Sequence, residues 1–334
     1  MTPSRPLHGS TDAEDFHDLT PSRVLGLVEE GFGLRLDSVC RPLTSYINRV
    51  YELQSADSQP WVAKFYRPGR WTDAAIRDEL VFVADLDEAE IPVVPALAGV
   101  DDRALQVREG LRFILMPRRR GRAWEEPGPG EWKALGQLLA RIHNTGAARE
   151  ARHRVVWRPS GATAIHLDEI LDGGIIGPPH LARRYEELVG GFIDEADPLF
   201  DDETFLRIHG DCHANNLLTR PGEGLRLIDF DDMATGPAVQ DLWMLLPGRA
   251  ADCRAELDAL LEGYTFFRDF APSSLRLIET LRVMRIVHFT AWCARQIRDG
   301  GAARLDPNFA TDSWWAREVG EMERQIEIAR AGAG

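Results

Sequence analysis

Short apolar runs separated by turn residues characterise residues 34–117. The runs occupy 34–36 with Val39, 50–53, 61–66, 105–107 and 111–116. Runs of this length, bounded by turn-forming residues, are typical of β-strands. One interval differs, because after Thr72 apolar residues recur every three or four positions up to Leu86, which is the period of a helix. This part of the chain therefore predicts a small β-sheet with one long helix.

The pattern becomes helical after residue 118. Helices are expected from residue 131 to about 146, from about 181 to 192, and over roughly 253–270, 273–299 and 311–331. A shorter helix near the start begins at Thr20-Pro21 and ends at Gly31, and residues 1–19 form a polar, flexible tail. We therefore predict a bilobal α+β chain with a tail at 1–19, a nucleotide-binding N-lobe at 20–117 and a mostly helical C-lobe at 118–334, which would carry catalysis and substrate binding.

Length and charge narrow the possible functions. At 334 residues the chain is long enough for two lobes, each with its own core. The formal net charge of −14 argues against a nucleic-acid partner, because a phosphate backbone is bound by concentrated positive charge. The chain has no apolar run of membrane-spanning length, its first residues lack the apolar core expected of a signal peptide, and its four cysteines form no C-x-x-C pair. We expect a cytoplasmic monomer that binds neither nucleic acid nor a membrane.

Two apolar runs near the middle of the chain carry polar residues suited to phosphate chemistry. Asp211 and Asn216 follow the first run, and Asp229 ends the next one after a turn at 221–224. A hairpin would bring these three side chains together. A carboxylate base, an amide oxygen and a second carboxylate are the groups that Mg²⁺-dependent phosphoryl transfer requires. This hairpin is therefore the candidate active site.

A rare lysine points to the same chemistry. Of the 39 basic residues only Lys64 and Lys133 are lysine, and Lys64 lies within an apolar strand. Glu79 lies on the apolar stripe of the following helix, where a carboxylate is costly unless it is paired. An ion pair between Lys64 and Glu79 would resemble the pair that places an ammonium on nucleotide phosphates in kinases. The alternative is that Glu79 lies at the edge of the stripe and is solvated.

The turn at 43–49 joins the first two predicted strands, where a kinase-like lobe covers the nucleotide phosphates. It has no glycine, but Ser45 and Asn48 are able to donate hydrogen bonds there. The same residues also suit an ordinary hairpin turn. The turn by itself does not distinguish these two interpretations.

A different reading starts from His209, Asp211 and His213, which alternate and would share one face of a strand. Such a set suits a Zn or Fe site and metal-assisted hydrolysis. No later cluster of His or Glu completes the site, and this reading leaves Lys64 and Asn216 unexplained. A metallohydrolase is therefore the weaker alternative.

The residues at 209–216, together with Ile228-Asp229-Phe230-Asp231, resemble the catalytic signature of the aminoglycoside phosphotransferase and choline kinase superfamily, which is similar to protein kinases. The resemblance covers roughly residues 20–330 and includes blocks at 43–51, 63–72 and 236–246 that look like a bacterial Ser/Thr protein kinase of the stress response. Asp231 stands where the kinase D-F-G motif has glycine, and Asn215 stands where the superfamily more often has glycine.

The resemblance implies a protein-kinase-like fold and a role for each motif residue. Asp211 would accept the proton, with Asp229 completing the catalytic pair, while Asn216 and Asp229 would bind Mg²⁺. Nucleotide binding would involve Lys64 and Glu79 as an ion pair and Ser45 in the loop over the ATP phosphates. His209 would orient the catalytic loop, and Asp241 would brace it.

The leading functional prediction is therefore ATP- and Mg²⁺-dependent phosphorylation of Ser or Thr on a protein substrate. A first alternative keeps the chemistry and changes the acceptor to a small alcohol such as an aminoglycoside or choline. A second is a nucleotide-binding regulator without turnover.

Overall fold

The computed structural model describes residues 16, 19–45, 47–125, 127–298 and 306–333. Its largest sheet is antiparallel and has the strand order β1-β2-β3-β5-β4. The strands are β1 Leu36–Leu43, β2 Arg49–Ser55, β3 Pro60–Phe65, β4 Gln106–Arg108 and β5 Leu111–Pro117. Two helices accompany this sheet: α1 Pro21–Phe32 and α2 Asp73–Glu88.

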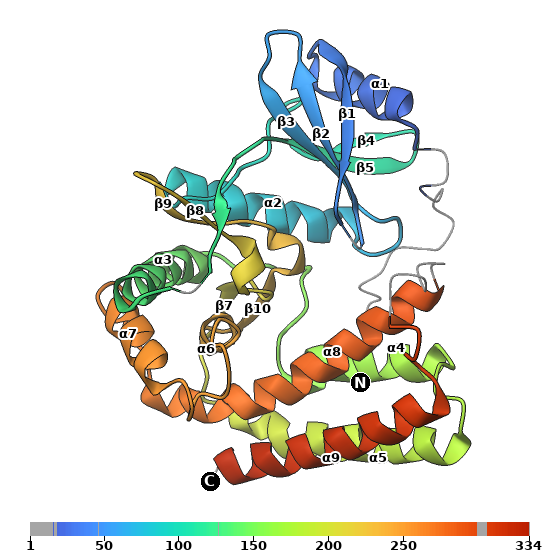
Figure 1. Cartoon of the computed structure of the whole chain (residues 1–334), viewed down its shortest axis with the longest axis vertical. Helices are drawn as coiled ribbons and strands as arrows, with labels where there is room; N and C mark the ends of the chain where they lie inside the picture. The colour runs from blue at the N-terminus through green and yellow to red at the C-terminus, as the bar shows by residue number, and fades with distance from the viewer. Residues whose placement is uncertain (1–15, 17–18, 46, 126, 299–305, 334) are drawn as a thin grey trace.

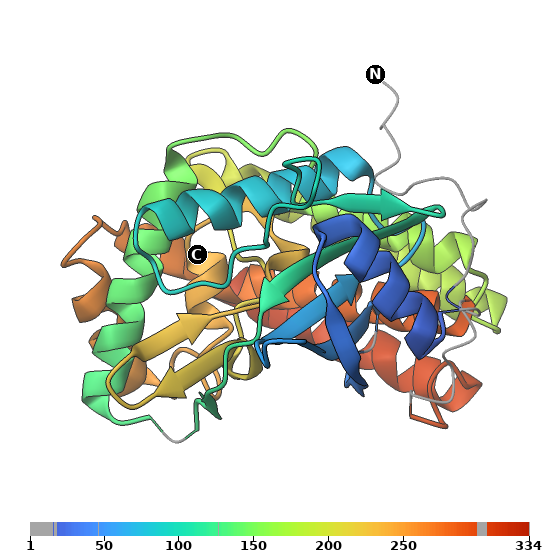
Figure 2. The same cartoon turned by 90° about the horizontal axis from the view of Figure 1, so that it is seen from above.

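The two faces of the sheet carry different helices. Alternate residues of a strand point to opposite faces, and β5 shows this directly. Phe113 and Leu115 pack in the core that contains α1, whereas Ile114 packs with Ile76 of α2. The sheet therefore lies between α1 and α2, with α2 on the side of the C-lobe (Figures 1 and 2).

The first helix begins as its sequence predicts but ends later. Thr20 accepts a hydrogen bond from the backbone N–H of Arg23, and Pro21 is the first helical residue. The prediction that Gly31 ends the helix is wrong, because α1 continues to Phe32 and Gly33 provides the left-handed cap. Gly31 instead allows close packing, since a Cβ there would lie 3.2 Å from the ring of Phe113.

Helix α2 connects the two lobes. Its Thr72 cap accepts a hydrogen bond from the N–H of Ala75. Ile76 faces the sheet, whereas Phe82 and Leu86, farther along the helix, pack in the core of the C-lobe. Glu79 is buried between these two contacts. The same amphipathic pattern that predicts the helix therefore places Glu79 at the junction of the lobes.

The rest of the chain is mostly helical and contains two small sheets (Figure 1). Its helices are α3 Pro129–Ala147, α4 Ala164–Asp172, α5 Pro179–Ala196, α6 Val239–Trp243, α7 Arg254–Tyr264, α8 Ile278–Arg298 and α9 Asp312–Ala333. Its strands are β6 Arg122–Ala123, β7 Phe205–Ile208, β8 Leu217–Arg220, β9 Gly224–Leu227 and β10 Ala234–Pro237. The predicted α+β class with a small sheet and a helical second part is confirmed.

The stretch that suggested a single hairpin divides between two sheets. β7 pairs with β10, whereas β8 pairs with β9 and β6. A left-handed turn at Gly210 and a 3-10 turn at Ala214–Asn216 separate β7 from β8. The hairpin proper is therefore β8–β9, and Asp211 lies on the loop that precedes it.

Most of the predicted tail, residues 1–15, 17 and 18, lies outside the described residues. Phe16 and Leu19 are buried and pack in the core beside α1. Within the parts of the chain that the structure describes, none of the helices is both long and apolar enough to span a bilayer.

Candidate active site

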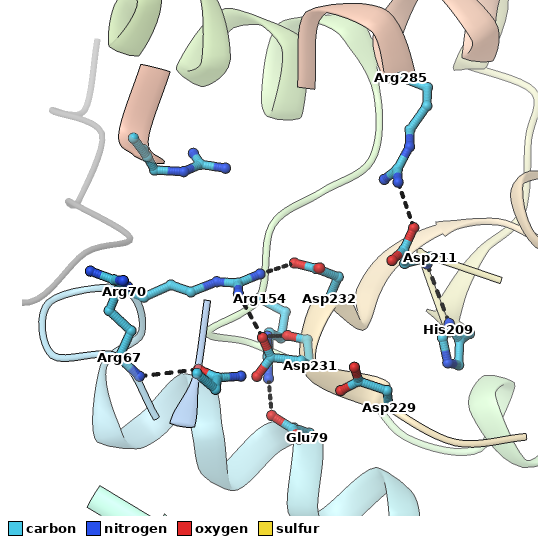
Figure 3. Close-up of polar contacts among 12 residues, drawn as sticks. Arg67, Arg70, Glu79, Arg154, His209, Asp211, Asp229, Asp231, Asp232 and Arg285 are labelled. Carbon is cyan, nitrogen blue, oxygen red and sulfur yellow. Dashed lines mark hydrogen bonds and ion pairs between the residues drawn. The ribbon is translucent and has the colours of Figure 1, made fainter. Parts of the chain in front are cut away.

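The loop between β7 and β8 carries the first candidate catalytic residues. The side-chain N–H of Asn216 donates to the backbone carbonyl of Asp211 at 3.0 Å, so the two residues are held in a fixed relation. The Nε2 of His209 lies 2.9 Å from the carbonyl oxygen of Ile228, and its Nδ1 accepts from the N–H of Asp211 at 3.3 Å. His209 thus joins the Asp211 loop to the strand that leads to Asp229 (Figure 3).

A buried carboxylate fixes the start of this loop. Asp241, at the beginning of α6, accepts hydrogen bonds from the N–H groups of His209 at 2.7 Å and Gly210 at 2.9 Å. His143 of α3 lies 3.1 Å from Asp241 and 2.8 Å from the hydroxyl of Tyr264. The bracing of the loop by Asp241, which the family resemblance implied, is thus present as two direct hydrogen bonds.

Gly210 allows the loop to approach the segment that follows β9. Its φ is +81°, and a Cβ at this position would lie 2.3 Å from the carbonyl oxygen of Asp232. Only glycine avoids both the unfavourable backbone conformation and the collision. Gly210 therefore brings the Asp211 loop against residues 229–232.

Asp229 adopts a left-handed backbone conformation, with φ 62° and ψ 66°. Such a conformation is uncommon for a residue other than glycine and is found at functional sites. Its carboxylate is 56% exposed, lines the same cavity as Asp211 and Asn216, and lies 3.2 Å from the Nζ of Lys64. Asp229 and Asn216 thus offer a carboxylate and an amide oxygen, which are the ligand types that suit Mg²⁺.

Lys64 on β3 lies at the centre of a buried charge cluster. Its Nζ is 3.4 Å from Glu79, 3.2 Å from Asp229 and 3.0 Å from Asp231. Burial lowers the pKa of Lys64, but the three carboxylates outweigh it and raise the pKa well above the ordinary value, so the ammonium stays charged. The predicted pair of Lys64 and Glu79 is in contact, and Glu79 is buried rather than solvated.

The same cluster contains Arg70, Arg154 and Asp231, which were not identified from the sequence as site residues. The Nη1 of Arg70 lies 2.8 Å from Asp231, and the Nη2 of Arg154 donates to Glu79 at 2.9 Å. All three side chains are buried. The one signal in the sequence was Asp231 in the place of the D-F-G glycine, and no local pattern marked Arg154, which comes from the irregular segment after α3.

Two cavities meet at Asp229. The first, of about 410 Å³, lies between the sheet and the β8–β9 hairpin and is lined by Lys64, Glu79 and Met116. The second, of about 420 Å³, contains Asp211, Asn216 and Arg285. Ser45 and Asp229 line both. The first cavity has the size of a small-molecule site, and the segment directly after Met116 forms part of its wall.

The loop at 43–49 reaches these cavities with some of its residues. Ser45 and Asn48 line both of them, and the side-chain oxygen of Asn48 also accepts a hydrogen bond from the N–H of Arg67 at 3.1 Å. Tyr46 lies outside the described residues.

Two basic side chains flank Asp211. Nη2 of Arg285 lies 2.7 Å from its Oδ1, and Nε2 of His213 lies 3.4 Å from its Oδ2. Burial raises the pKa of Asp211, but His213 and Arg285 outweigh burial and hold the pKa below its usual range. The carboxylate is therefore ionised at neutral pH.

The metallohydrolase alternative finds no support in this geometry. Both ring nitrogens of His209 are engaged with backbone atoms. Among the residues described by the structure, no group of three or more His, Cys, Asp or Glu side chains is placed to hold a metal ion.

Comparison with known proteins gives consistent matches. Residues 39–278 match the model of the phosphotransferase enzyme family. The chain is 35% identical over 331 residues to stress response kinase A of Escherichia coli strain K12, covering 96% of each chain. It is 33% identical over 321 residues to serine/threonine protein kinase RdoA of Salmonella typhimurium strain LT2, covering 95% of each. The resemblance to a bacterial stress-response kinase is thus confirmed.

Solved structures of low sequence identity share the fold. An amicoumacin kinase bound to AMP-PNP, Ca²⁺ and amicoumacin superimposes with a TM-score of 0.72 at 16% identity, covering 92% of this chain and 93% of that one. A spectinomycin phosphotransferase bound to ADP and spectinomycin gives a TM-score of 0.63 at 16% identity, covering 93% and 98%. With the family match over most of its length, the chain belongs to the phosphotransferase enzyme family.

Proposed function

We propose that this protein is an ATP- and Mg²⁺-dependent kinase that phosphorylates Ser or Thr of protein substrates in a bacterial stress response. The observation that carries the proposal is the meeting of two cavities at Asp229, with Lys64 in the first and Asp211 in the second. The names of the relatives, stress response kinase A and serine/threonine protein kinase RdoA, support the protein acceptor and the biological setting.

The residues divide the chemistry between them. Asp211 accepts the proton of the acceptor hydroxyl, whose oxygen bonds to the γ-phosphorus while the bond from that phosphorus to the β,γ-bridging oxygen breaks and ADP leaves. Lys64, which forms an ion pair with Glu79, neutralises charge on the nucleotide phosphates. Ser45 in the loop at 43–49 lines the same cavity and contacts these phosphates. Asn216 and Asp229 hold Mg²⁺, which when bound neutralises the charge that develops on the phosphates.

We propose lobe boundaries at 20–117 and 118–334, with nucleotide binding in the first and acceptor binding in the second. The first large sheet ends with β5 at Pro117, and the strands after it belong to the smaller sheets. We also propose that the enzyme acts as a monomer in the cytoplasm, where ATP is available.

Incubation with γ-labelled ATP and Mg²⁺ tests the proposal. Wild-type protein is expected to label added polypeptides on Ser or Thr, and Asp211→Asn is expected to lower the rate by about 10²–10⁴-fold, the usual contribution of a positioned base. Asp252→Asn, an exposed carboxylate after β10 and α6, is the matched control and should retain full activity. Nucleotide binding should persist in Asp211→Asn, because this residue lies outside the first cavity.

A small alcohol is the second candidate acceptor. The two solved structures of this fold named above are an amicoumacin kinase and a spectinomycin phosphotransferase, each in complex with its small molecule, and this supports the alternative. Label that appears on a small alcohol and on no polypeptide would replace the protein-kinase proposal with this one. A regulator without turnover would instead bind nucleotide and show no difference between wild type and Asp211→Asn in any product.

A further inference from the structure

Helix α8 places a guanidinium directly against the candidate catalytic base. Arg285 forms an ion pair with Oδ1 of Asp211 at 2.7 Å, and its side chain is 27% exposed. Figure 3 shows that it reaches Asp211 from the side away from Asp229 and Glu79. Arg285 lines the second cavity and not the first. It therefore lies on the acceptor side of Asp211 and not on the nucleotide side.

The guanidinium contacts one of the two Asp211 oxygens that could accept the proton of an acceptor hydroxyl. Among the described residues, Oδ1 of Asp211 is a buried oxygen with no hydrogen-bond donor, so its contact with Arg285 is an ion pair without hydrogen-bond geometry. The other oxygen, Oδ2, faces His213. A hydroxyl that gives its proton to Oδ1 must enter beside the guanidinium or displace it.

Among the described residues that line the second cavity, a displaced Arg285 finds no spare carboxylate. Asp231 and Asp232 are held by Arg70 at 2.8 Å and 2.5 Å. Asp229 contacts Lys64 and is assigned to the metal. Separating a partly buried charge from its partner is unfavourable unless another partner replaces it. The replacement has to arrive with the acceptor or come from outside this cavity.

Glu318 and Glu321 of α9 line a neighbouring hollow that Arg285 also borders. Burial and the nearby Glu321 raise the pKa of Glu318 to about 7, so at neutral pH this carboxyl is only partly ionised. It is therefore a weaker partner for the guanidinium than a carboxylate that is fully ionised.

An aromatic platform continues from Arg285 along the same face of α8. Phe289 and Trp292 follow at four and seven residues and stack with ring centroids 5.6 Å apart and an interplanar angle of 17°. Both line the second cavity, and Phe289 is 53% exposed. Neither residue packs in the hydrophobic cores. An exposed phenyl ring stacked on a partly buried indole, both lining the cavity of the candidate base, is suited to holding an apolar part of a substrate.

We propose that Arg285 determines acceptor specificity by pairing with a carboxylate next to the phosphorylated hydroxyl, while Phe289 and Trp292 hold an adjacent apolar side chain. The preferred acceptor is a Ser or Thr flanked by Asp or Glu and by an apolar residue. This inference rests on the proposed protein-kinase function and adds the class of sequence that the site selects. In the absence of acceptor, Arg285 keeps its pair with Asp211.

Two peptides that differ only in the residue beside the Ser, Asp in one and Lys in the other, test the inference with full-length protein, Mg²⁺ and labelled ATP. Wild type is expected to prefer the Asp peptide by about tenfold in kcat/KM, equivalent to about 1.4 kcal/mol. Arg285→Glu should reverse the preference, and Arg285→Lys should keep it. Arg324→Gln, an exposed arginine of α9, is the matched control and should behave as wild type.

The possible outcomes separate the two proposals. Label on both peptides with equal kcat/KM, or an equal loss of kcat on both in Arg285→Glu, overturns the specificity role and leaves the kinase function standing. Label on neither peptide overturns the protein-kinase function and the inference with it. The proposal is also wrong if Arg285→Glu leaves the preference for the Asp peptide unchanged and Glu318→Gln abolishes it. In that case the displaced Arg285 would pair with Glu318 of α9 and not with the acceptor. Circular dichroism of each variant verifies that it folds.

Discussion

The ammonium of Lys64 lies 3.0 Å from the carboxylate of Asp231, and this contact joins the large sheet to the segment that carries Asp229. The two residues are 6% and 4% exposed, so the interaction is shielded from water. The Nη1 of Arg70 lies 2.8 Å from Oδ2 of Asp231, whereas Lys64 contacts Oδ1. Asp231 thus positions the lysine as well as balancing its charge.

Asp231→Asn is expected to destabilise the protein by about 3 kcal/mol, the lower end of the range for breaking a buried ion pair, because Lys64 keeps Glu79 and Arg70 keeps Asp232 as partners. Chemical denaturation followed by circular dichroism measures this. Asp232→Asn is the control: Asp232 forms an ion pair with Arg70 and its side chain is 23% exposed, so its loss should cost about 1 kcal/mol or less. Equal losses in the two variants would contradict the central role assigned to Asp231.

The same carboxylate gives the protein a defined response to acid. Burial raises the pKa of Asp231, but Arg70 and Lys64 outweigh it and hold the pKa below its usual range. A carboxyl with a lowered folded-state pKa stabilises the fold above its unfolded pKa, which is about 4, and loses this contribution as the pH falls further. Denaturation midpoints measured from pH 6 to pH 3 should fall less steeply in Asp231→Asn than in wild type.

Gly210→Ala should damage the catalytic loop. The substitution places a Cβ 2.3 Å from the carbonyl oxygen of Asp232 in a residue with φ +81°. We expect a loss of more than about 2 kcal/mol in stability together with a lower kcat. Gly222→Ala separates collision from backbone strain, since Gly222 has the same φ of +81° and nothing within 4 Å of the added atom. A similar loss in both variants would show that strain alone is responsible.

Asp241→Asn should loosen the same loop from the other side. The carboxylate accepts from the N–H groups of His209 and Gly210 with different oxygens, and an amide supplies only one acceptor. We expect a cost of about 1.5–3 kcal/mol, the range for a lost hydrogen bond to a charged group. Hydrogen exchange should show faster exchange at these two amides, whereas unchanged protection there would contradict the bracing role.

Glu318 should make the protein less stable as the pH rises through the weakly acidic range. Burial and Glu321 raise its folded-state pKa to about 7, so the folded state retains a proton that the unfolded state releases above about 4.5. Stability therefore falls as the pH rises between these values, by about 3 kcal/mol. Glu318→Gln should flatten this part of the stability profile. A profile identical to that of wild type would rule out a raised pKa.

The sequence predicted most elements because local pattern and tertiary burial agree in them. The strand runs at 50–53 and 61–66 became β2 and β3, and the three- and four-residue period after Thr72 became α2. The ends of the elements were predicted less accurately than their presence and type. Gly31 resembles a helix stop in sequence, yet the helix continues past it, since the absence of a side chain there serves packing against Phe113.

Some residues of the candidate site were likewise predicted from the sequence, whereas others became apparent only in the structure. The spacing of Asp211, Asn216 and Asp229, and the rarity of Lys64 among arginines, identified from sequence alone the residues that the structure places around two adjoining cavities. Their spacing is informative because the chemistry requires several groups on one short segment. The partners that set their charges, Arg154 and Arg285, were not predicted. Arg154 lies on the segment after α3 and Arg285 on α8, so only the tertiary structure brings these guanidinium groups to Glu79 and Asp211, which are far from them in the sequence.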